Sequence, residues 1–183
     1  KSTISASRLK SVGKNLFDKK ELSNLKTAQL TGDGDLGEIK FSEGAYANQV
    51  PANSPFERYF YSFFEAGKTY TISRNMSNYT AGSEGRMTIL EFNENPPLVF
   101  TSHGAGMTYN TVTIPQNWDE YKQRPLLIYG RHYNVFSEIQ IVEGDTQAPY
   151  EPYTESTQYI PNVGELRSLP NGTKDEIRVS GGK

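Results

Sequence analysis

The stretch EIQIVEGDTQAPYEPYTES (138–156) decides where the folded part of the chain ends. Ile139 and Ile141 alternate with polar residues, so a β-strand here would point both isoleucines toward a hydrophobic core. Gly144 lets the chain turn after this strand, and the two prolines that follow keep the exit from pairing as a further strand. A proline-rich ligand would need both prolines on an exposed polyproline helix. The stretch therefore predicts the end of a domain near residue 153, not a peptide ligand or a catalytic loop.

Upstream of this stretch, short segments rich in Tyr, Phe, Ile and Thr are separated by Gly, Asn or Pro. Such segments are typical of strands, and their spacing favours an antiparallel β-sandwich over alternating βαβ units. The 16 glycines and 10 prolines agree with many turns. We therefore expect an all-β fold with strands in EIKFS (38–42), RYFYSFF (58–64), EAGKTYTISRN (65–75), GRMTILEFN (85–93), TYNTVTIP (108–115), RPLLIYGRHY (124–133) and SEIQIVEG (137–144).

Three parts of the chain differ in composition. Residues 1–14 are small, basic and polar, and we expect them to be an N-terminal connector. Residues 15–153 carry all the strand signals and one predicted short helix, capped by Asp18 and Glu21. Residues 154–183 have little periodicity, and we expect them to be a C-terminal linker that leads to a following domain.

Charge and composition limit the partners of this chain. The net charge is −2 and the pI is near 5.8. No Lys/Arg cluster stands out, so we expect no nucleic-acid partner, which would need a basic face. No apolar run reaches the length of a membrane span, so we expect no membrane insertion. The chain has no cysteine, which removes disulfides and thiol catalysis and favours an intracellular, bacterial or viral origin.

Four phrases of the sequence resemble modules found in tail and baseplate proteins of phages and prophages of Gram-positive bacteria. The closing phrase (138–156) is the most specific, and GKNLFD (13–18) comes second, while AGKTYTIS (66–73) and QYIPNVGELRSLPNGTKDEI (158–177) also match. The resemblance spans most of the chain. It implies a jelly-roll β-sandwich similar to carbohydrate-binding modules, in a virion protein of the phage tail or baseplate. The partners that it implies are host cell-wall or envelope saccharides and other tail proteins. The matched phrases look structural, so they carry no binding residue over to this chain.

Aromatic side chains are the natural candidates for a saccharide site, because a sugar ring packs its C–H face on an aromatic ring. If RYFYSFF is a strand, Tyr59 and Tyr61 share one of its faces. By the same alternation, Tyr129, Arg131 and Tyr133 share one face of RPLLIYGRHY. A structural role in covering the sandwich is the alternative for most tyrosines.

Trp118 is the strongest single candidate for a contact with a saccharide. It lies in the polar stretch PQNWDEY, which predicts a loop and an exposed indole ring. Arg86 and Arg131 are expected to be the polar partners of sugar hydroxyls, because strands would hold both of them in place.

The acidic stretch TGDGDLGE (31–38) raises a calcium hypothesis. Asp33, Asp35 and Glu38 supply the hard oxygen ligands that calcium prefers, and the glycines permit tight turns. The closing glutamate of an EF-hand loop is missing, and a plain acidic turn is the alternative. No cofactor is required, and a structural calcium ion is the only one that the sequence suggests.

The sequence lacks a recognisable catalytic constellation. It has two histidines, His103 and His132, and no G-x-S-x-G phrase. We therefore expect a non-catalytic module that binds host cell-surface saccharides and aids adsorption. The main alternative is a purely structural decoration or spacer that docks on other tail subunits. A hydrolase that degrades the cell wall is a third, less favoured reading, because acidic residues can always form some pair in space.

Overall fold

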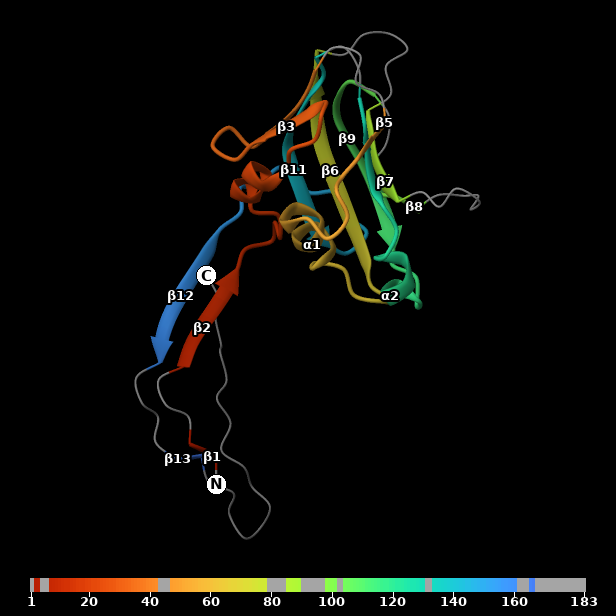
Figure 1. The fold of residues 1–183 in the computed structure, drawn as a ribbon. Helices are drawn as coiled ribbons and strands as arrows, with labels where there is room; N and C mark the ends of the chain where they lie inside the picture. Colours follow the sequence, from red (N-terminus) through yellow and green to blue (C-terminus); the bar gives the residue numbers. More distant parts are fainter. Residues whose placement is uncertain are drawn as a thin grey trace. The chain divides into compact units, whose positions relative to one another are not determined.

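The fold was obtained as a computed structural model (Figure 1). The chain forms two compact units, one of residues 14–153 and the other of residues 1–13 together with 154–183. None of the described helices is long and apolar enough to cross a membrane. The structure describes residues 2–3, 7–42, 47–78, 85–89, 98–101, 104–130, 133–160 and 165–166.

Two antiparallel sheets build the unit of residues 14–153, which confirms the predicted mostly β fold and is consistent with a β-sandwich. The five-stranded sheet has the order β3 (Leu30–Asp33), β4 (Glu38–Phe41), β11 (Val135–Glu143), β6 (Thr69–Ser77) and β9 (Gly106–Thr113). The four-stranded sheet has the order β5 (Ala47–Gln49), β10 (Leu126–Tyr129), β7 (Arg86–Ile89) and β8 (Leu98–Val99). From β4 onward the chain passes from one sheet to the other after every strand except β7, which is followed by β8 in the same sheet.

One hydrophobic core is shared by both sheets. The two-residue period of a strand points alternate side chains inward, so Ile72 of β6 and Ile128 of β10 are fully buried, whereas the intervening positions face outward. Phenylalanines from several elements fill the space between these layers, and each buries a large apolar area. The phenylalanines that are fully buried are Phe17, Phe56, Phe60, Phe100 and Phe136.

The segment RYFYSFF, which was predicted to be a strand, is largely helical, so that prediction was wrong. Helix α1 (Pro55–Tyr61) begins after Ser54, whose hydroxyl accepts a hydrogen bond from the N–H of Glu57 (3.2 Å). A serine N-cap followed by proline is a strong start signal for a helix. Aromatic rings also recur at the four-residue spacing of a helix face, in Phe56, Phe60 and Phe64, and pack into the core.

The short helix predicted near the N-terminus is confirmed as the 3-10 helix η1 (Lys19–Asn24). The carboxylate of Asp18 accepts a hydrogen bond from the N–H of Lys20 (3.0 Å) and caps the helix. The predicted capping role of Glu21 is not seen. Its carboxylate instead accepts a hydrogen bond from the side-chain amide of Asn24 (2.8 Å). The side chain of Asp18 therefore caps the helix without a reciprocal bond from Glu21.

The side chain of Asn15 joins three parts of the unit that are distant in sequence. Asn15 is only 1% exposed. Its Oδ1 accepts hydrogen bonds from the backbone N–H groups of Phe17 (3.0 Å) and Ile141 (3.1 Å). Its Nδ2 donates to the carbonyl oxygens of Ile139 (3.4 Å) and Glu151 (2.9 Å). One buried amide therefore ties the start of the unit to strand β11 and to the segment that leaves the unit.

Gln140 holds the closing stretch against the outer face of the five-stranded sheet. It lies opposite Ser73 in the β11–β6 ladder, just after a β-bulge, and both side chains point away from the core. Its Oε1 accepts a hydrogen bond from the N–H of Glu151 (2.8 Å), and its Nε2 donates to the carbonyl oxygens of Ala148 and Pro149 (3.3 Å each). The proline-containing stretch is therefore bound to its own sheet and is not presented as a free ligand.

The two flanking segments, which we expected to be a connector and a linker, pair with each other. Strand β2 (Ser7–Val12) is antiparallel to β12 (Glu155–Ile160), and β1 (Ser2–Thr3) is antiparallel to β13 (Glu165–Leu166). Residues 1–14 suggested a connector by their small, basic and polar composition, and residues 154–183 suggested a linker by their low periodicity. Neither feature prevents pairing, because the hydrogen bonds of a ladder come from the backbone, whatever the side chains.

Asn15→Ala is expected to lower the free energy of unfolding by about 2–4 kcal/mol, because the buried N–H groups of Phe17 and Ile141 lose their acceptor. Asn24→Ala is the matched control. Its amide is exposed and, among the described residues, binds Glu21 alone. Its loss should change stability by less than about 0.5 kcal/mol. Urea unfolding followed by circular dichroism measures both. A loss below about 1 kcal/mol for Asn15→Ala would contradict this role of the amide.

Candidate functional site

Two of the predicted saccharide-binding residues, Tyr61 and Trp118, meet between α1 and α2 (Trp118–Tyr121). Their ring centroids are 5.6 Å apart and the rings are nearly perpendicular (85°). Two adjoining hollows, about 270 and 390 Å³ in volume, open here, and both are lined by Tyr61, Ser62 and Lys122. We call them together the α1–α2 hollow. The structure thus brings together two candidates that lie 57 residues apart in the chain and that no sequence pattern links.

Trp118 is not the exposed loop residue that the sequence suggested. The stretch around it forms the short helix α2, and the indole is only 5% exposed. Its ring packs edge-on against Phe64 as well as Tyr61. The burial of Trp118 could not be predicted from its polar neighbours in the sequence, because these neighbours occupy the outer side of a single helical turn. Only a small part of the indole reaches the α1–α2 hollow, so it cannot serve as a stacking platform.

Tyr59 lies on a different side of α1 from Tyr61, because two residues along a helix turn the side chain by roughly 200°. Its ring packs against Phe17 and Phe63, with centroids 5.8 and 4.8 Å away. Its hydroxyl accepts a hydrogen bond from the backbone N–H of Asp18, and burial raises the pKa of this phenol. Tyr59 therefore fastens α1 to the segment before η1, and the predicted shared face of Tyr59 and Tyr61 does not form.

Arg86 and Tyr129 come together on the outer face of the four-stranded sheet. They are direct cross-strand partners in the β7–β10 ladder, and the Arg86 guanidinium carbon lies 4.5 Å from the centroid of the Tyr129 ring. This cation–π contact covers the ring, and Tyr129 is buried. Tyr133 precedes β11 and is 58% exposed, with a φ of 61°. Arg131 lies outside the described residues.

The outer face of β6 and β9 carries aromatic and polar side chains that the sequence analysis did not select. Tyr109 and Met107 project outward from β9 and are 48% and 41% exposed. Tyr109 lies opposite Ser73 and Met107 lies opposite Asn75 in the ladder. Beside them, Thr111 lies opposite Thr71. We call these six residues the β6–β9 face. Alternation along TYNTVTIP could have identified it, because inward-pointing Val112 fixes Tyr109 on the outer side.

Polar contacts mark the border of the β6–β9 face on the side of β11. The Asn75 amide donates to the Glu138 carboxylate (3.2 Å), and the Thr71 hydroxyl donates to the carbonyl oxygen of Gly144 (2.9 Å). Gln140, opposite Ser73, is covered by the closing stretch that it binds. Ser73 and Thr71 of β6 are themselves buried. The open part of the face is therefore the outer side of β9, with the exposed Tyr109 at the sheet edge and the partly exposed Asn75 beside it.

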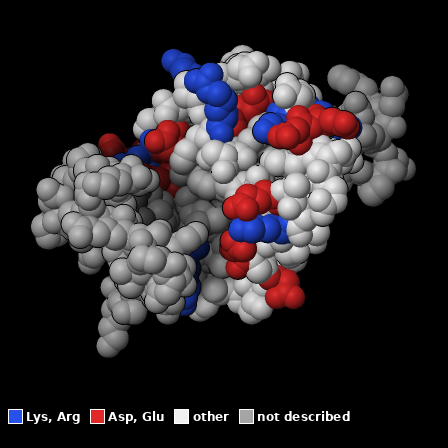
Figure 2. Space-filling model, turned by 90° about the horizontal axis from the view of Figure 1, so that it is seen from below, with Lys and Arg blue, Asp and Glu red and all other residues white. Residues whose placement is uncertain are grey.

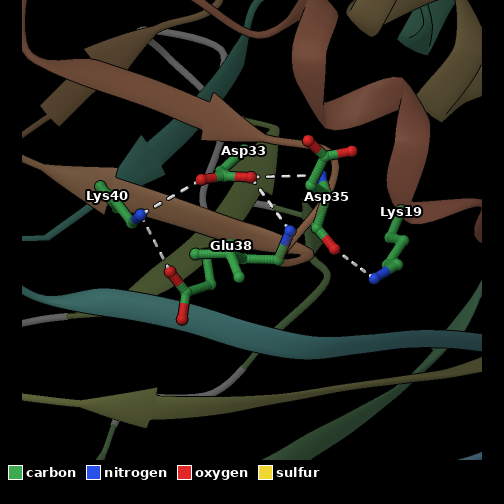
Figure 3. Close-up of polar contacts among 6 residues, drawn as sticks. Lys19, Asp33, Asp35, Glu38 and Lys40 are labelled. Carbon is green, nitrogen blue, oxygen red and sulfur yellow. Dashed lines mark hydrogen bonds and ion pairs between the residues drawn. The ribbon is translucent and has the colours of Figure 1, made fainter.

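Two of the three acidic residues considered for calcium, Asp33 and Glu38, are paired with Lys40, whereas Asp35 accepts a hydrogen bond from Lys19 through its backbone carbonyl oxygen (Figure 3). The Lys40 ammonium lies between Asp33 and Glu38, at 3.3 and 3.1 Å from their carboxylate oxygens. The other oxygen of Asp33 accepts hydrogen bonds from the N–H groups of Leu36 (3.0 Å) and Asp35 (3.1 Å). These contacts, the Leu36 bond foremost, lower the pKa of Asp33, and the bond to Glu38 raises the pKa of Lys40. Within the described ranges, no group of three or more His, Asp or Glu side chains is arranged to hold a metal ion.

Charges of both signs are interspersed on the face of the molecule seen in Figure 2. The ion pairs of the 14–153 unit show the same pattern at closer range. Lys68, for example, lies between Glu65 (3.0 Å) and Glu143 (3.4 Å). Such alternation gives no extended basic surface on this face of the kind that neutralises a phosphate backbone.

Trp118→Ala is expected to lower the free energy of unfolding by about 3–5 kcal/mol, because it removes a large buried ring from the core. Trp118 is the single tryptophan of the chain, so its fluorescence should be blue-shifted in the folded protein and shift to longer wavelength on unfolding. Tyr109→Ala, at an exposed position, should change stability by less than about 0.5 kcal/mol. Equal stability of Trp118→Ala and the wild type would contradict the burial of the indole.

Calcium is expected to leave the melting temperature of the wild type unchanged, because the Lys40 ammonium already occupies the space between the two carboxylates. Lys40→Met frees Asp33 and Glu38, and any response to calcium should be confined to this variant. Thermal unfolding with added calcium and with EDTA measures the effect. A melting temperature of the wild type that rises with calcium concentration, as linkage requires for a bound ion, would establish a site.

Comparison of the chain with protein-family models, with curated proteins and with solved structures found no match. The functional argument therefore depends on the residues and their geometry. Within the described part of the chain, that geometry offers two places where side chains could meet a ligand. One is the β6–β9 face, which is open and carries an exposed tyrosine, and the other is the α1–α2 hollow.

Proposed function

We propose that the protein is a non-catalytic module that binds saccharides of the bacterial cell surface through its β6–β9 face. The observation that carries the proposal is the exposed ring of Tyr109, which projects from an edge strand beside small hydroxyl and amide side chains. A sugar ring can pack its C–H face on such a tyrosine while its hydroxyls exchange hydrogen bonds with the neighbouring polar groups.

The residues beside Tyr109 suit a ligand with many hydroxyl groups. The hydroxyl of Thr111, which is exposed, can both donate and accept hydrogen bonds, and Asn75 keeps an amide oxygen beyond the bond that its nitrogen makes to Glu138. The sheet backbone holds these groups at fixed spacing, so little conformational entropy is lost on binding. An open surface of this kind predicts modest affinity, which several copies in one assembly would amplify through avidity.

A jelly-roll β-sandwich similar to carbohydrate-binding modules is the fold that we propose in detail. The order of strands supports it. β4, β11, β6 and β9 lie side by side in one sheet, and β5, β10, β7 and β8 in the other. The chain thus alternates between sheets, as it does when two Greek keys wrap around one core. Alternation of this kind places sequentially distant strands next to each other.

The proposed setting is a phage or prophage tail or baseplate, where the module acts at the surface of the host cell. Its support is the resemblance of the opening and closing phrases, together with their physical meeting point. Asn15 belongs to GKNLFD, Ile141 and Glu151 belong to the closing phrase, and one amide bonds them all. The proposed partners are a cell-wall or envelope saccharide and other tail proteins.

The alternative is a purely structural decoration or spacer that docks on other tail subunits. It gains support from the aromatic residues that already have internal partners. Tyr59 is bonded to Asp18, Tyr129 lies under Arg86, and Trp118 packs in the core. A hydrolase is the weakest of the three proposals.

Tyr109→Ala is expected to weaken binding to purified host cell-wall polysaccharide about fivefold to tenfold, because a ring contact worth about 1–1.4 kcal/mol is lost. Tyr133→Ala is the matched control, since this tyrosine is also exposed but lies outside the β6–β9 face. A titration with the polysaccharide, supported by a glycan array, measures both.

Three outcomes separate the proposals. Wild-type protein that is folded but binds no host polysaccharide at millimolar ligand would remove the saccharide function and leave the structural alternative. Binding that Tyr109→Ala and Tyr133→Ala reduce equally would exclude the β6–β9 face. Release of soluble fragments from host cell walls in zymography would point to the hydrolase.

A further inference from the structure

The α1–α2 hollow is a second place where a ligand could bind, and none of its residues belongs to the β6–β9 face. The smaller of its two parts, about 270 Å³, is lined on one side by three residues of α1 and by the residue that follows the helix, namely Glu57, Arg58, Tyr61 and Ser62. These positions lie on one side of the helix because they are spaced by one, four and five residues. A hollow of this volume holds a substituent or a single sugar unit, not a long chain.

The groups at the base of this hollow are already bonded within the protein. The buried carboxylate of Glu57 accepts hydrogen bonds from the N–H groups of Asn53 (2.6 Å) and Leu126, and its burial raises its pKa. The hydroxyl of Tyr61 donates to the carbonyl oxygen of Arg124 (3.1 Å). Ligand recognition is therefore left to the side chains at the rim.

The rim offers mainly hydrogen-bond donors. Arg58 is exposed, and its guanidinium makes no hydrogen bond or ion pair within the described part of the chain, whereas its backbone N–H donates to the carbonyl oxygen of Ser54 in the helix (3.1 Å). The side-chain amides of Asn53 and Gln123, which also line the hollow, are likewise without a partner among the described residues. Lys122 adds a cation, whose charge is balanced by the carboxylate of Asp119. Glu57 is the only acidic residue lining the smaller part, and its oxygens are engaged below the rim.

An unpaired guanidinium beside two free amides is suited to an oxyanion. Arginine presents a planar fork of N–H donors that binds a carboxylate or phosphate through two parallel hydrogen bonds. Neutral sugar hydroxyls can accept these hydrogen bonds, but they leave the guanidinium charge without a counterion. The chemistry of the rim therefore favours a negatively charged group over a neutral sugar.

We propose that the α1–α2 hollow binds an anionic substituent of a glycan, a carboxylate or a phosphate group, with Arg58 as its main ligand and with Asn53 and Gln123 as further donors. The glycan identity rests on the proposed function, but the residues are separate from the β6–β9 face. The hollow would then select acidic cell-surface polymers, while the β6–β9 face holds the sugar rings.

The test is a titration of the full chain with glucuronic acid, with glucose 6-phosphate and with neutral glucose, followed by NMR of the side-chain amide groups. We expect at least one of the two acids to shift the signals of Asn53 and Gln123, and glucose to leave them unchanged. Arg58→Gln should weaken that binding at least about tenfold, because the charged hydrogen bonds are lost. Lys26→Gln, an equal change of charge at an exposed lysine outside the hollow, should have no effect.

The acid that binds more tightly identifies the preferred substituent: glucuronic acid indicates a carboxylate, and glucose 6-phosphate indicates a phosphate. The proposal is overturned if neither acid binds, if glucose shifts the same signals equally, or if Arg58→Gln and Lys26→Gln behave alike. Tyr109→Ala should retain binding of the small acids. Binding of the acids without any binding of host polysaccharide would therefore refute the saccharide function of the β6–β9 face and leave the anion site standing.

Discussion

The fold of residues 14–153 depends on the buried amide of Asn15. Strand β4 pairs with β11 only at Val135 and Phe136, and beyond the bulge β11 would have unpaired backbone groups on that side. The Asn15 side chain and the N–H of Leu16 satisfy them instead. A buried N–H or C=O without a partner costs about as much as a lost hydrogen bond, so this region cannot form without the segment that begins the unit.

The same contact explains why the two ends of the unit behave as a pair. Glu151 is held by Asn15 through its carbonyl oxygen and by Gln140 through its N–H, so neither the first nor the last segment is complete alone. The phrases GKNLFD and EIQIVEGDTQAPYEPYTES, which carry the resemblance to phage tail modules, meet at these bonds. These phrases therefore have a structural reason of their own, because together they close the fold of the 14–153 unit.

The sequence predicted the strands whose alternation is regular, including β6, β9 and β11, because a strand with one buried face needs a two-residue period. It failed at RYFYSFF, where β-prone residues outweighed the capping signal of Ser54 and Pro55 just upstream. It failed at Trp118, because burial under a single helical turn leaves no periodic trace. The partners of Arg86 and Lys40 depend on which strands pair, and long-range pairing is not encoded in local sequence.

The pairing of the flanking segments determines how tension would act on the molecule. β2 and β12 run antiparallel, from the pair Ser7 and Ile160 to the pair Val12 and Glu155. A force that pulls Ser7 and Ile160 apart therefore breaks the backbone pairs of this ladder one after another. The 14–153 unit bears no load until the last pair has separated and the bond from Gly13 to Thr154 has broken. Force applied at these ends would therefore separate β2 from β12 before it deforms the 14–153 unit.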